Sequence, residues 1–97
     1  FLPTRRNVGD SAARAGGQVQ VSGHTDNIPI AFSERFDSNW DLSAARAAAV
    51  ADFFFANNDI TSERVSVFGY ADTKPVADND SATGRAQNRR IEILIDS

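Results

Sequence analysis

The sequence predicts a small α/β (α+β) domain with helices packed on one face of a mixed sheet. Apolar and polar side chains alternate at residues 18–22 and 65–69, and residues 91–95 are mostly apolar. These three patterns are typical of strands. A fourth segment, from residue 42 to about residue 57, is rich in alanine and predicts a long helix. Because helical segments separate the strands, we expect some neighbouring strands to be parallel and joined by right-handed crossovers.

Composition describes one globular domain covering residues 1–97, with 41% hydrophobic and 24% charged residues. The net charge of -3 argues against a nucleic-acid partner, because phosphate binding requires a basic surface. The chain has no cysteine, which excludes disulfides and thiolate chemistry. Its single histidine, His24, makes a zinc or iron site unfavourable, so we expect neither a metal nor another cofactor.

The first elements are a weak helix at residues 3–15, in which Pro3 suits the first turn, and the strand at residues 18–22. Val19 and Val21 lie on one face of that strand, and Gly23 ends it. Residues 27–38 form a loop that is long for a small domain.

The long helix places an apolar stripe on the core, and the Asn57 region ends it. Trp40 and the run Phe53 to Phe55 are expected to be mainly core aromatics, although three successive phenylalanines on a helix cannot all face one core. Of the two later strands, residues 91–95 are the more apolar and are expected in the middle of the sheet. A short helix at residues 82–88 lies between these strands.

Two opposite charges are expected at neighbouring element ends. Asp26 follows the first strand, and Arg46 lies in the first turns of the long helix, pointing back toward its start. Opposite charges held on a rigid frame suit a zwitterionic ligand, although a structural salt bridge between them fits the spacing equally well. Ser43 fits a helix-start residue better than a nucleophile.

Several separated motifs occur together in order: Gly23-His24-Thr25-Asp26, Asn39 with Leu42-Ser43 and Arg46-Ala47, Gly69-Tyr70-Ala71-Asp72, and Asn88-Arg89-Arg90-Ile91-Glu92. Through them the chain resembles the OmpA-like peptidoglycan-binding domain over almost its whole length. Within that family, the long loop and the string Ser38-Asn39-Trp40-Asp41-Leu42-Ser43 look like the B subunits of flagellar stators, of the MotB and PomB type.

The resemblance implies a non-catalytic periplasmic domain of a single-pass inner-membrane protein, which anchors a flagellar stator to the cell wall. Its ligand is then peptidoglycan, held by the diaminopimelate of the stem peptide. Asp26 matches the residue that receives the ligand's ammonium, and Arg46 matches the one that takes its carboxylate. The same pocket is lined by Thr25, Asn39, Arg89 and the backbone near Leu42.

The resemblance also implies partners and an incomplete sheet. The family usually has a strand before its first helix, and we expect it to be missing here. An exposed sheet edge, or the helix that carries the phenylalanines, is then expected to form a homodimer. A stator A subunit would be reached through a membrane segment outside this sequence.

Three alternatives stay open. The first is a general outer-membrane or lipoprotein anchor of the same fold. A second is a hydrolase of cell-wall peptides, and a third is a dimerisation module without a ligand.

Overall fold

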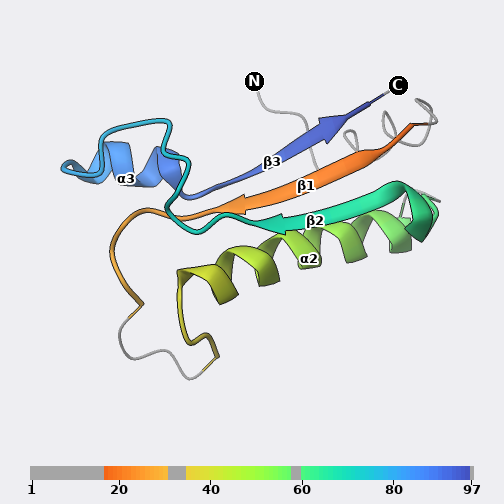
Figure 1. Ribbon diagram of the computed structural model, residues 1–97, viewed down its shortest axis with the longest axis horizontal. Coiled ribbons are helices and arrows are strands. Elements are labelled where there is room, and N and C mark those ends of the chain that lie inside the picture. The colour runs from red at the N-terminus through yellow and green to blue at the C-terminus, as the bar shows by residue number, and fades with distance from the viewer. Residues whose placement is uncertain (1–16, 31–34, 58–59, 97) are drawn as a thin grey trace.

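The computed structural model describes residues 17–30, 35–57 and 60–96, which include three strands and two α-helices (Figure 1). The expected helix at residues 3–15 lies outside this part of the chain. The other predicted elements are present, within three residues of their expected bounds. They are β1 (Val19–His24), α2 (Asn39–Asn57), a 3-10 turn (Ser62–Arg64), β2 (Val65–Gly69), α3 (Ala82–Asn88) and β3 (Arg90–Ile95).

The described strands form one sheet in the order β2-β1-β3. β1 and β2 are parallel, with Gly23 opposite Gly69, and β1 and β3 are antiparallel. The prediction that the last strand lies in the middle is therefore wrong, because β1 carries both ladders. The apolar composition of β3 reflects the packing of its alternate residues Ile91, Ile93 and Ile95 against the core, while Leu94 is exposed.

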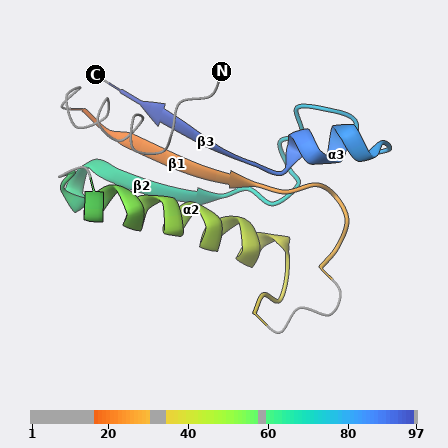
Figure 2. The ribbon, with the colours of Figure 1, turned by 180° about the vertical axis from the view of Figure 1, so that it is seen from behind.

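The core lies between the sheet and α2, which packs along β1 and β2 (Figures 1 and 2). Phe54 is fully buried, whereas Phe53 is half-buried and Phe55 is exposed, so the phenylalanine run divides as helical geometry requires. Trp40 is 55% exposed, and its expected place in the core is wrong. The buried apolar cluster consists of Val19, Val21, Ala47, Val50, Phe54 and Ile60.

The two helices do not share a face. α3 lies beyond the end of the sheet, where β1 and β2 finish and β3 begins, rather than beside α2 (Figure 2). It has only seven residues, and its start is capped by the Ser81 Oγ, which accepts a hydrogen bond from the Gly84 N–H at 3.0 Å. Its position brings the end of α3 close to the loop that leaves β1.

α2 begins at Asn39, three residues earlier than predicted, because Ser38 caps it. The Ser38 carbonyl accepts from the Leu42 N–H at 3.0 Å, and the Ser38 Oγ accepts from the Asp41 N–H at 3.4 Å. Ser43, which we expected to start the helix, lies inside it and is fully buried.

Candidate functional site

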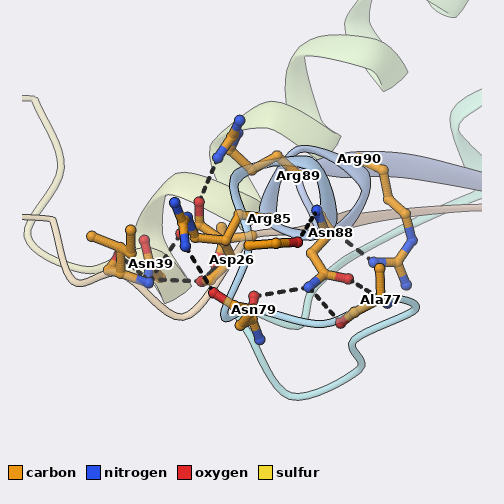
Figure 3. Close-up of polar contacts among 12 residues, drawn as sticks. Asp26, Asn39, Ala77, Asn79, Arg85, Asn88, Arg89 and Arg90 are labelled. Atoms are coloured by element: carbon orange, nitrogen blue, oxygen red, sulfur yellow. Dashed lines mark hydrogen bonds and ion pairs between the residues drawn. The ribbon is translucent and has the colours of Figure 1, made fainter.

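Asp26 lies just past the end of β1 and is almost fully buried. Its Oδ1 accepts from the Ile28 N–H at 3.0 Å, and its Oδ2 accepts from the Arg89 Nη1 at 2.6 Å (Figure 3). The ion pair that the structure places at Asp26 is therefore with Arg89, and not the bridge to Arg46 that spacing alone allowed. Both carboxylate oxygens are held by the protein, which fixes their direction.

Thr25 and Asn39 hold the backbone around this carboxylate. The Thr25 Oγ1 donates to the Asp26 carbonyl at 2.8 Å, and the Thr25 N–H donates to the Ala71 carbonyl. The Asn39 Nδ2 donates to the carbonyls of Asp26 and Ile28, at 3.4 and 3.0 Å. Thr25 and Asn39, both predicted site residues, thus shape the loop that presents Asp26.

Ser43 joins the start of α2 to the loop after β2. Its Oγ donates to the Trp40 carbonyl and accepts from the Ala71 N–H, both at 3.1 Å. Ala71 has φ of 53°, in the left-handed region that residues other than glycine rarely adopt. These bonds hold that conformation in place, because Ala71 is buried and both of its backbone groups are engaged.

Arg46 lines two shallow clefts. The first, which we call the α2–β3 cleft, has a volume of about 290 Å³ and is lined by Arg46, Ala49, Val50, Arg89, Arg90 and Ile91. The second, of about 330 Å³, is lined by Arg35, Phe36, Leu42, Ala45, Arg46 and Ala49. Arg46 therefore shares one cleft with Arg89 and the other with Leu42. The Leu42 N–H, expected near the ligand, donates to the Ser38 carbonyl at 3.0 Å.

Asn88 was not predicted to have a role, yet it organises the segment that carries Arg89. It is fully buried, and its Oδ1 accepts from the N–H groups of Val76 and Ala77 at 2.8 and 3.0 Å. Its Nδ2 donates to the Ala77 carbonyl and to the Asn79 Oδ1 (Figure 3). The one available signal was its place before Arg89 in the Asn-Arg-Arg motif.

His24 is the last residue of β1, two positions before Asp26. It is buried, stacks on Tyr70 at 5.3 Å between ring centroids, and brings its Nε2 to 3.1 Å from the Ser22 Oγ. Burial lowers the pKa of His24 below 6.5, Arg90 and Lys74 lower it further, and Glu92 opposes the shift. Within the described residues, no group of three or more histidine or acidic side chains could hold a metal ion.

We expect the domain to lose stability as the pH falls from about 7 to about 5.5. Because the pKa of His24 is lowered by folding, the unfolded chain binds more protons in this range, and the free energy of unfolding decreases below pH 6.5. Urea unfolding at several pH values measures this slope. As the chain has one histidine, His24→Gln should flatten it, and equal slopes in parent and variant would contradict the assignment.

The described residues contain no helix with the length and hydropathy needed to cross a membrane. The OmpA family model matches residues 5–89. Motility protein B of Bacillus subtilis is 48% identical over 77 residues, which is 79% of this chain and 29% of that protein. Peptidoglycan-binding protein ArfA of Mycobacterium tuberculosis is 37% identical over 78 residues, 80% of this chain and 22% of that protein. The chain thus spans less than a third of the length of these relatives.

Solved structures agree with the sequence comparison. The cell wall anchor of the T6SS from Pseudomonas aeruginosa superposes with a TM-score of 0.83 at 48% identity, covering 92% of this chain and 61% of that one. The periplasmic domain of Helicobacter pylori MotB superposes with a TM-score of 0.81 at 28% identity, covering 92% and 55%. Because the family model matches residues 5–89, which are most of this chain, the chain belongs to the OmpA family.

Proposed function

We propose that this domain binds peptidoglycan without catalysing a reaction, and so anchors a larger protein to the cell wall from the periplasm. The observation that carries the proposal is the fixed carboxylate of Asp26, beside an arginine that shares a cleft with Arg46. A free diaminopimelate end carries an ammonium and a carboxylate on one carbon. We assign its ammonium to Asp26 and its carboxylate to Arg46.

The charges at the site favour such a ligand. An ionised carboxylate has about four lone-pair positions, so Asp26 keeps acceptor capacity beyond its bonds to Ile28 and Arg89. Arg46 can hold a carboxylate with two parallel hydrogen bonds, and charge-assisted bonds contribute about 1.5–3 kcal/mol each. Lysine at position 46 should bind less well, since it lacks the planar fork.

For the larger protein we propose a flagellar stator B subunit. The likeness to Motility protein B and to the Helicobacter pylori MotB domain supports this assignment. The partners are then a stator A subunit, reached through a membrane segment, and a second copy of this chain.

A wall anchor of another assembly is the second candidate. The T6SS cell wall anchor is as similar in sequence as Motility protein B, at 48% identity. The whole protein distinguishes the two: a transmembrane helix carrying an ion-binding Asp favours the stator, and a barrel or lipoprotein signal favours a general anchor.

Cosedimentation with purified diaminopimelate-type peptidoglycan tests wall binding. We expect the parent domain to pellet with the wall, and Asp26→Ala and Arg46→Ala to stay in the supernatant while circular dichroism shows them folded. Asp52→Ala and Lys74→Ala remove the same charges at exposed positions and should pellet like the parent. Binding that survives both site substitutions would refute the site, and release of soluble wall fragments would refute the non-catalytic assignment.

A further inference from the structure

Arg89 contacts the Asp26 carboxylate, to which we assign the ligand's ammonium, and also lines the cleft of Arg46, to which we assign its carboxylate. Its Nη1 donates to the Asp26 Oδ2 at 2.6 Å, and its side chain lines the α2–β3 cleft with Arg46. The Arg89 side chain is 45% exposed, whereas that of Asp26 is 11% exposed. A guanidinium has five N–H donors, so the bond to Asp26 leaves donors for a ligand in the cleft.

The charges that line the α2–β3 cleft favour the carboxylate of the ligand in this part of the site. The positive charge of Arg89 balances the negative charge of Asp26, and Arg46 adds a further positive charge to the cleft. The third arginine of the cleft, Arg90, is occupied by Glu92 and by the carbonyls of Asn88 and Lys74. Of the described residues that line the cleft, none is acidic.

We propose that Arg89 determines specificity by making the site require a free carboxylate on the diaminopimelate end, so that a wall peptide amidated at this carboxyl group is rejected. The inference rests on the proposed function. Arg46 and Arg89 together hold the carboxylate, and Asp26 links Arg89 to the neighbouring ammonium. A primary amide carries no charge and turns an NH₂ donor toward guanidinium donors, which cannot accept it.

Two synthetic tripeptides test this proposal by calorimetric titration. Both are L-Ala–γ-D-Glu–meso-diaminopimelate. They differ only at the diaminopimelate carboxyl group on the carbon that bears the free side-chain amine, which is unmodified in one tripeptide and a primary amide in the other. The parent should bind the free acid about tenfold more tightly or better, as expected for losing charge-assisted bonds. In Arg89→Gln the ratio of the two affinities should fall to about threefold, because Arg46 is then the one guanidinium of the pair left to bind the ligand's carboxylate.

Lys74→Gln is the matched control, since it removes one positive charge outside the α2–β3 cleft and should keep the parent ratio. If the parent binds both tripeptides equally, the inference fails while wall binding stands. If Arg89→Gln weakens both by the same factor, Arg89 only supports the loop, and the inference is again overturned. Tighter binding by Arg89→Gln would make Arg89 a competitor of the ligand's ammonium and contradict the proposal. If neither tripeptide binds the parent, the proposed function fails with it.

Discussion

Gly23→Ala should destabilise the domain by about 3 kcal/mol or more, because the new methyl group has no room. A Cβ at Gly23 would lie 2.0 Å from the Ser43 carbonyl oxygen and 2.8 Å from the Ser43 carbonyl carbon. These are backbone atoms of α2, so the helix must move away from the sheet as a unit. That movement would pull Ser43 from Ala71 and open the core around Val21.

Chemical unfolding in urea measures this loss, and Gly69→Ala provides a graded comparison. A Cβ at Gly69, the partner of Gly23 in the parallel ladder, would meet Ala44 atoms at 2.8–2.9 Å, a milder clash. We therefore expect Gly69→Ala to be destabilised less than Gly23→Ala. A Gly23→Ala domain within about 0.5 kcal/mol of the parent would show that α2 does not approach the sheet this closely.

Asn88→Ala should cost about 2–4 kcal/mol of stability and also abolish wall binding. The substitution removes the hydrogen bonds that the fully buried Asn88 side chain makes to the Val76 and Ala77 N–H groups, the Ala77 carbonyl and the Asn79 Oδ1, and it leaves a cavity in their place. The loop at residues 76–79 then loses its hydrogen bonds to Asn88, while the bond from Arg85 Nη1 to the Asn79 carbonyl remains. Arg89, the next residue, loses the frame that directs it to Asp26.

Unfolding in urea and cosedimentation with peptidoglycan, run on the same preparations, separate the two effects. Gln87→Ala, at an exposed neighbouring position on α3, should match the parent in both. Asn88→Asp is nearly isosteric but places an acceptor against the Ala77 carbonyl and the Asn79 Oδ1, so it should also be destabilised. Full stability and binding in Asn88→Ala would contradict the role of this network.

Within the described residues, local signals were sufficient to predict the strands and α-helices but not the order of the strands in the sheet. The bounds of α3 agree with the prediction because Ser81 is a local cap. The start of α2 was displaced because the capping Ser38 was read as part of the loop. The place of β3 was predicted wrongly because apolar content reports burial of a face, whereas the strand order depends on long-range pairing.

Four of the residues predicted for the site lie together, but their contacts were not predicted. Thr25, Asp26, Asn39 and Arg89 are joined by hydrogen bonds, as expected for one site. The pairing of Asp26 with Arg89 joins residues 63 positions apart, and only the placement of α3 beyond the sheet brings them together. The Asn88 network was missed for the same reason, since its partners belong to a loop without regular structure.

A crystal structure of the domain with the free-acid tripeptide tests the central claim most directly. We expect the ammonium of the diaminopimelate end within hydrogen-bonding distance of the Asp26 carboxylate, and its carboxylate against the guanidinium of Arg46. Ligand bound instead in the separate cleft lined by His24, Tyr70 and Lys74 would contradict the account, because Asp26 and Arg46 would then have no part in recognition.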